Sequence, residues 1–211
     1  MSAAAVPFAS SVASTVFATS AQIVDRETKV VYSKVRKLLI GLLSDTHIAL
    51  PSETLPPQIR DAFRDVDLIL HAGDIWIPSV LDELESIAPV MAAWGDDDLE
   101  TDLSGDKRMV DERSLHFNGV TLWLMHDKPP YGHIRPKEAL YYLRPSSQES
   151  DDPPDVVVFG HTHRPIIEHY KDALLVSPGS ATLPNYEPRL GTVARLTINS
   201  GEIEVHIVQL E

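Results

Sequence analysis

The chain has 211 residues, of which 43% are hydrophobic and 23% are charged, a composition that supports a folded domain and excludes disorder throughout. It has no cysteine, which excludes disulfide scaffolds, iron–sulfur clusters and thiol nucleophiles. The 18 lysines and arginines against 31 acidic residues give a net charge of −13, so binding to duplex nucleic acid is not expected.

The first 24 residues carry no charged side chain. They lack the basic residues that open a secretory signal, and interspersed serines and threonines break the apolar run of about 20 residues that a membrane span needs. We therefore predict a flexible N-terminal extension over residues 1–36, a single domain over residues 37–211, no membrane span and a cytoplasmic location. A targeting segment at the N-terminus is the alternative.

From residue 38 onward, apolar runs alternate with stretches whose apolar residues are spaced for one helical face. We expect strands at 38–43, 67–70 and 89–94, and helices at 57–66 and 78–87. The strands are apolar on both faces, which is typical of parallel strands covered on two sides. This alternation predicts βαβ units and a mainly parallel sheet.

The second half of the domain has a different pattern. The Asn118–Gly119 pair predicts a hairpin over residues 114–125, because Asn-Gly favours a type I′ turn. A helix is expected at 136–143, a polar surface loop at 145–154 and a buried strand at 156–159. We predict that the last four strands form an antiparallel meander, at 166–170, 173–176, 193–198 and 203–208.

Five of the expected strands are followed at once by aspartate or histidine. The sequences at these points are Ser-Asp45-Thr-His47, His-Ala-Gly-Asp74, Gly-Asp96, His126 and Gly-His161-Thr-His163. Because ligands of open α/β sheets bind beyond the carboxyl ends of the strands, these side chains should converge on one rim. Three neighbouring glycines would let the backbone turn sharply there, namely Gly73, Gly95 and Gly160.

Three carboxylates and four imidazoles at one rim would be costly without a cation, because like charges shift one another's pKa. Two divalent cations roughly 3.5–4 Å apart, sharing one carboxylate, would resolve this crowding. Mixed Asp and His ligands favour transition metals over magnesium or calcium. We expect manganese, with iron, zinc, cobalt or nickel as alternatives, and such a pair generates hydroxide near neutral pH and binds phosphoryl oxygens.

The ordered set Asp-x-His, Gly-Asp, Gly-Asp-x-Asp, an isolated His and Gly-His-x-His resembles the calcineurin-like metallophosphoesterases, and among them the small single-domain phosphodiesterases. The resemblance extends from about residue 38 to residue 208 and includes Ser177-Pro-Gly-Ser180, near the family's Asn-Pro-Gly-Ser turn. It implies an α/β (α+β) fold, in which a β-sandwich of mixed sheets is flanked by helices.

The resemblance also implies a role for each residue of the rim. The first metal would be held by Asp45, His47 and His163, and the second by Asp96, His126 and His161, with Asp74 bridging the two. The nucleophile would be a metal-bridging water, and the residues nearest the reaction would be Asp74, Asp96, His126 and His161. The resemblance implies hydrolysis of a small phosphoester, and a diester in preference to a monoester.

Three positions depart from the family pattern. Asp96 stands where these enzymes usually have Asn, His126-Asp127-Lys128 stands where small phosphodiesterases often have His-Gly-His, and Ser177 replaces the Asn of the turn. A non-catalytic scaffold resembling the retromer's metallophosphoesterase-like subunit, which also has Asp at the position of Asp96, is therefore an alternative. The intact Asp74 argues against it. A regulatory metal- or nucleotide-binding domain is a third reading.

Overall fold

The computed structural model describes residues 37–98, 103–110, 113–127 and 154–211. The first of two sheets contains β1 (Leu38–Leu43), β2 (Leu68–His71), β3 (Val90–Ala93), β4 (Met109–Val110), β10 (Thr192–Asn199) and β11 (Glu202–Gln209), in the order β11-β10-β1-β2-β3-β4. The second contains β5 (Arg113–Phe117), β6 (Val120–Leu124), β7 (Val156–Val158), β8 (Pro165–Tyr170) and β9 (Ala173–Pro178), in the order β5-β6-β7-β9-β8.

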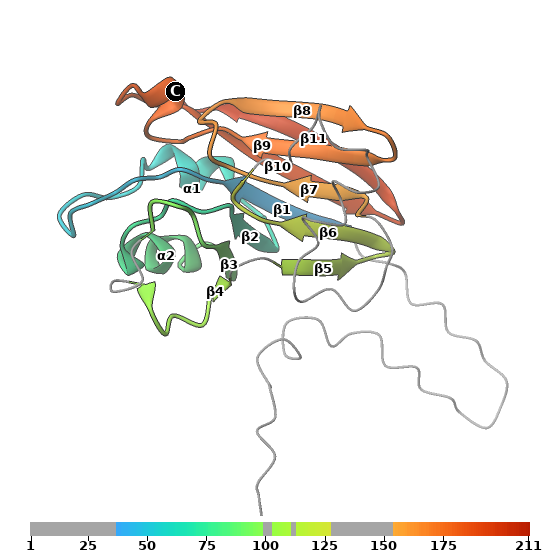
Figure 1. Cartoon of the computed structure of the whole chain (residues 1–211), viewed down its shortest axis with the longest axis horizontal. Helices are drawn as coiled ribbons and strands as arrows, with labels where there is room; N and C mark the ends of the chain where they lie inside the picture. Colours follow the sequence, from blue (N-terminus) through green and yellow to red (C-terminus); the bar gives the residue numbers. More distant parts are fainter. Residues whose placement is uncertain (1–36, 99–102, 111–112, 128–153) are drawn as a thin grey trace, which may run out of the picture. The chain divides into compact units, whose positions relative to one another are not determined.

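The two sheets form a sandwich (Figure 1). Strands β1 to β4 run parallel, whereas β10 pairs antiparallel with β1 and with β11. The second sheet is also mixed, because β6, β7 and β9 are parallel and β5 and β8 pair antiparallel at its edges. The predicted sandwich of mixed sheets is confirmed.

The layer between the sheets is a buried aliphatic cluster. Side chains alternate along each strand, so Ile40 and Leu42 of β1 face this layer together with Leu122 of β6 and Val158 of β7. All four are fully buried, and each such side chain contributes about 1.5–3 kcal/mol relative to an exposed one.

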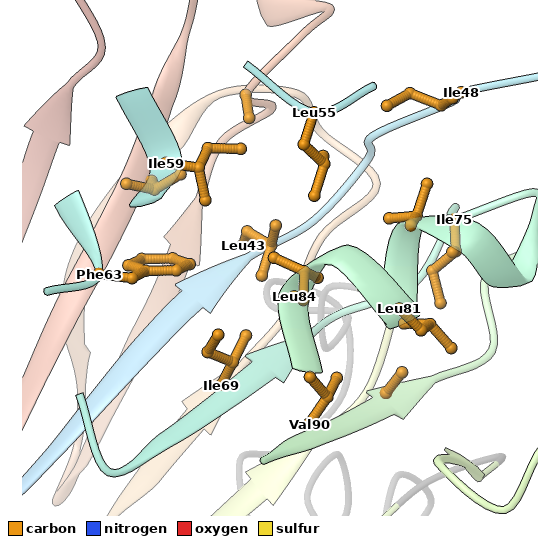
Figure 2. Close-up of a cluster of buried hydrophobic side chains, with 14 of the residues drawn as sticks. Leu43, Ile48, Leu55, Ile59, Phe63, Ile69, Ile75, Leu81, Leu84 and Val90 are labelled. Atoms are coloured by element: carbon orange, nitrogen blue, oxygen red, sulfur yellow. The ribbon is translucent and has the colours of Figure 1, made fainter. Parts of the chain in front are cut away.

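The opposite face of the first sheet packs against α1 (Gln58–Ala62) and α2 (Pro78–Glu85), in the cluster drawn in Figure 2. Phe63 lies directly over β1 at Gly41, where an added Cβ would come within 2.9 Å of the aromatic ring. The glycine that interrupts the apolar run of β1 therefore makes room for Phe63. Both faces of β1 to β3 are covered, which explains their continuous hydrophobic sequence.

Most predicted elements are present, with shifted ends. The hairpin β5–β6 turns at Asn118 and Gly119, which both have positive φ, as a type I′ turn requires. The first helix is shorter than the predicted 57–66, because the chain leaves helical geometry at Phe63 and Asp65 has a φ of 66°. The two-residue strand β4 was not predicted.

The predicted antiparallel meander is wrong. The last four strands form two hairpins, β8–β9 and β10–β11, which belong to different sheets. The segment from Gly179 to Gly191 connects β9 of the second sheet to β10 of the first, where β10 pairs with β1. Hydrophobic alternation identifies a strand but not its partner, because the pattern is the same in either sheet.

Some predictions fall outside the described residues. These are the extension over residues 1–36, the helix at 136–143 and nearly all of the loop at 145–154. In the part of the chain that the structure describes, no helix is long and apolar enough to cross a membrane.

Candidate metal centre

The seven predicted ligands lie together where β1, β2, β3, β6 and β7 end. Their ligand atoms form two groups, in each of which all the atoms lie within 4.8 Å of one another. The first group contains Asp45, His47, Asp74 and His163, and the second contains Asp96, His126 and His161. This division matches the two predicted ligand sets, so the convergence that the strand ends predicted is present in the fold.

The first group is buried. The Nε2 atoms of His47 and His163 lie 3.2 Å apart. Asp74 Oδ2 is 3.3 Å from His47 Nε2, and Asp45 Oδ1 is 3.6 Å from His163 Nε2. Asp45 has no exposed side-chain surface. Two imidazole nitrogens and two carboxylates thus point at one small volume from which water is largely excluded.

The second group shares Asp74 with the first. Asp74 Oδ2 lies 3.4 Å from His126 Nε2 as well as 3.3 Å from His47 Nε2. Asp96 Oδ1 lies 2.9 Å from His126 Nε2 and 3.2 Å from His161 Nδ1. Asp74 therefore stands between the groups, the place that a bridging carboxylate requires. Asp96 lies at the more open side of the second group, and 57% of its side chain is exposed.

The histidine tautomers suit cation binding. The carbonyl oxygens of Leu183 and Ala72 accept hydrogen bonds from Nδ1 of His163 and of His126, at 2.8 and 2.7 Å. Nδ1 therefore carries the proton in each ring, and Nε2 of the neutral ring presents its lone pair to the site. These lone pairs face one another and also face carboxylates. Only a cation or a proton can attract all of them at once, so the residues fit a metal pair.

The pKa values follow from the same crowding. Burial raises the pKa of Asp45 and lowers the pKa of His47. Burial also disfavours protonated His126, but its contacts with Asp74 and with the Ala72 carbonyl outweigh this effect and raise its pKa to about 9. Without metal, a proton on His126 thus takes the place of a cation between Asp74 and Asp96. Metal binding at this group would release that proton.

The backbone at the site is strained. Asp45, His47, Asp74, His161 and His163 all have positive φ, between 44° and 64°. Such conformations are uncommon for residues other than glycine and persist only where the surrounding structure imposes them. Five of the seven candidate ligands are thus held in left-handed geometry, a cost that is typical of functional sites.

The glycines act partly by leaving space. Of Gly73, Gly95 and Gly160, only Gly73, with a φ of 88°, has the left-handed geometry that a sharp turn would require. A Cβ on Gly95 would collide with the carboxylate of Asp74, and φ is not positive there. The predicted reason is therefore incomplete, because Gly95 is needed chiefly for the close approach of Asp74.

Asp98 holds the loop that carries Asp74. Its two carboxylate oxygens accept four backbone N–H groups, from Asp74 at 3.0 Å, Ile75 at 2.6 Å, Trp76 at 2.8 Å and Gly95 at 2.8 Å. The sequence did not indicate this role for Asp98. Its contacts fix the ends of β2 and β3 relative to each other, and no periodic pattern could have indicated them.

The Ser177–Ser180 turn supports the loop after β1. Ser180 Oγ donates to the carbonyl oxygen of Asp45 at 2.7 Å and accepts from the N–H of Leu183 at 2.7 Å. Ser44 Oγ donates to the carbonyl oxygen of Gly179 at 3.0 Å. The resemblance of this turn to the family motif therefore corresponds to a structural role beside Asp45.

Tyr186 is a site residue that the sequence did not indicate. Its ring stacks on His163 with the centroids 4.0 Å apart, and its hydroxyl donates to the carbonyl oxygen of His161 at 3.2 Å. Tyr186 is 64% exposed. One face of its ring covers His163, and the opposite face of the tyrosine ring is open to solvent. A tyrosine in a proline-rich loop carries no signal of such a contact.

The fold and the site define the class. Two mixed sheets with Asp and His ligands at their joint rim are the framework of a metallophosphoesterase. The chain matches the calcineurin-like phosphoesterase superfamily domain over residues 38–201 and belongs to that superfamily.

Relatives of the small phosphodiesterase type are among the similar proteins. A probable metallophosphoesterase of Methanothermobacter thermautotrophicus is 34% identical over 172 residues, which are 82% of this chain and 92% of the relative. A phosphodiesterase of Methanocaldococcus jannaschii is 28% identical over 66% of this chain and 82% of its own length. Zinc-complexed Vps29 of Entamoeba histolytica is 21% identical, covers 82% of this chain and all of its own, and has a TM-score of 0.59, which shows the shared fold.

Proposed function

We propose that this protein is a dinuclear metal-dependent phosphoesterase that hydrolyses phosphodiesters. The first metal would be held by Asp45, His47 and His163 and the second by Asp96, His126 and His161, with Asp74 between them. The observation that carries this proposal is the position of Asp74 Oδ2, at 3.3 and 3.4 Å from one imidazole of each group. Bound there, two cations would supply a hydroxide near neutral pH and neutralise charge on the phosphoryl oxygens.

The residues of the chain would fix the geometry of this reaction. Asp74 is held by the backbone N–H of Asp97, 3.0 Å from its Oδ1, so only Oδ2 faces the histidines. His161 is 48% exposed and lies beside the exposed Asp96, at the open side of the site. Substrate would therefore reach the second group from the side of these two residues.

Manganese is our first choice of metal, and the zinc complex of a protein with the same fold supports zinc as the alternative.

The charge of the site favours diesters. Three carboxylates cancel most of the charge of two divalent cations, so little remains to attract a doubly charged phosphate monoester. A diester carries less charge and suffers less from this cancellation.

Chelation is the direct test of the proposed function. Exhaustive treatment with EDTA should abolish hydrolysis of bis(4-nitrophenyl) phosphate, and added Mn²⁺ should restore it. Metal content measured by mass spectrometry should rise to two ions per chain as activity returns. Full activity in the chelated, metal-free protein would contradict the proposal. Two bound ions with no turnover of any phosphoester would favour the scaffold alternative.

Asp96→Asn should increase phosphodiesterase activity. The substitution removes one negative charge and provides an NH₂ that can donate to a phosphoryl oxygen. Because Asp96 is more than half exposed, we expect a gain of up to about tenfold in kcat/KM, equivalent to about 1.4 kcal/mol, and a lower pH optimum. Asp127→Asn, an equal charge change at a 77% exposed neighbour, is the control. Lower activity of Asp96→Asn at unchanged metal occupancy would show that the carboxylate itself assists catalysis.

A further inference from the structure

A pocket of about 450 Å³ opens beside His47, between the segment that links β1 to α1 and the segment that links β9 to β10. Thr46 and His47 form the wall on the side of the metal centre. The floor is continuous with the helix-side core, where Figure 2 shows Ile48 and Leu55 next to one another at the edge of the cluster. The volume lies within the range of about 300–1,000 Å³ that small-molecule sites occupy.

The lining of this pocket is largely apolar and has almost no charge. Apolar surface comes mainly from Ile48, Leu55, Pro56, Leu183, Pro188 and Leu190. Among the described residues that line the pocket there is no lysine or arginine, and Glu53 is the charged one. A second phosphate group would find no cation here and would face a carboxylate. The pocket therefore suits an uncharged organic group.

We propose that this pocket binds one organic substituent of the phosphodiester, and that the substituent is uncharged and mostly apolar. This inference rests on the proposed function, since the phosphoryl group would lie at the metal centre next to His47. It assigns the choice of substrate to the segments 48–58 and 182–190, which lie outside the candidate ligand set.

The first experiment compares two phosphodiesters with the same 4-nitrophenolate leaving group, in which the second substituent is 2-naphthyl or methyl. Burial of the aromatic group should raise kcat/KM of the parent protein at least about tenfold for the naphthyl diester. Thr54→Trp fills the pocket from an exposed lining position and should remove this preference. Ser52→Trp, two residues earlier, exposed and not in the lining, should retain it. If Thr54→Trp does not fold, Pro188→Trp replaces it, because Pro188 lines the opposite wall of the pocket.

The second experiment measures binding without catalysis. The metal-free protein is titrated with 2-naphthol, and binding is followed by NMR. The parent and Ser52→Trp should bind 2-naphthol, and Thr54→Trp should not.

The two experiments separate failure of the pocket from failure of the enzyme. If 2-naphthol binds, Thr54→Trp abolishes this binding and neither diester is hydrolysed, the proposed pocket is supported and the proposed phosphoesterase activity is contradicted. If kcat/KM is equal for both diesters and 2-naphthol does not bind, the proposed binding role of the pocket is contradicted, while the proposed phosphoesterase activity still stands.

Discussion

Asp74→Ala and His163→Ala should each lower kcat/KM for a phosphodiester by more than about a thousandfold, because each removes a ligand and with it several kcal/mol of transition-state stabilisation. Asp74 contacts one imidazole of each group, so its loss should empty or misplace both metals. His163 contributes to the first group alone. Mass spectrometry should therefore find fewer ions bound to Asp74→Ala than to His163→Ala.

The fold should survive both substitutions. Neither side chain belongs to the three hydrophobic clusters. In the metal-free protein, removal of Asp74 relieves repulsion with Asp45, which offsets the lost contact with protonated His126. The thermal midpoint of each metal-free variant should stay within a few degrees of the parent. His206→Ala, at a 65% exposed histidine on β11, is the matched control and should leave activity and metal content unchanged. Parent-level turnover in both ligand variants would refute the assignment of the rim.

Asp98→Asn should weaken metal binding by about 10- to 100-fold, although Asp98 belongs to neither ligand group. The carboxylate accepts four backbone N–H groups, and an amide can present only one oxygen to them while its NH₂ would face the others. The loop that carries Asp74 should then lose its fixed position. Isothermal titration with Mn²⁺ measures the loss of affinity directly.

A purely structural role for Asp98 would give a different result. Loss of charged hydrogen bonds should lower the unfolding free energy of the metal-free protein by about 1–3 kcal/mol in either case. Only a positioning role also lowers the metal affinity of the folded protein. Asp97→Asn makes the same charge change at an exposed neighbour and should alter neither quantity much. A destabilised Asp98→Asn that binds Mn²⁺ as tightly as the parent would rule out positioning.

The local sequence was sufficient to predict most of the strands and the candidate ligands. Apolar runs marked β1, β2, β3, β6 and β7 because strands that are buried on both faces must be hydrophobic throughout. The ligands stood out because they directly follow these runs, and parallel neighbours such as β1 and β2 end at one edge. The Asn118–Gly119 turn was predictable for a similar reason, since few residue pairs accept two positive φ angles.

Contacts that join distant segments could not be predicted in this way. Asp98 is 22 to 24 residues from the Asp74 loop that it holds, and Tyr186 is 23 residues from the ring on which it stacks. Hydrophobic periodicity reports which face of an element is buried, and it contains no information about hydrogen bonds to a backbone elsewhere in the chain.

By itself, the sequence determined a mixed α/β domain, its strand ends and the seven side chains that meet there. Only the tertiary structure decided which sheet each of the last two hairpins joins, because a half-buried strand has the same pattern in either sheet. It also decided that Asp98 holds the loop of Asp74 and that a pocket opens beside His47. Both features arise where loops from separate strands pack together, and their positions depend on the closure of the whole sandwich.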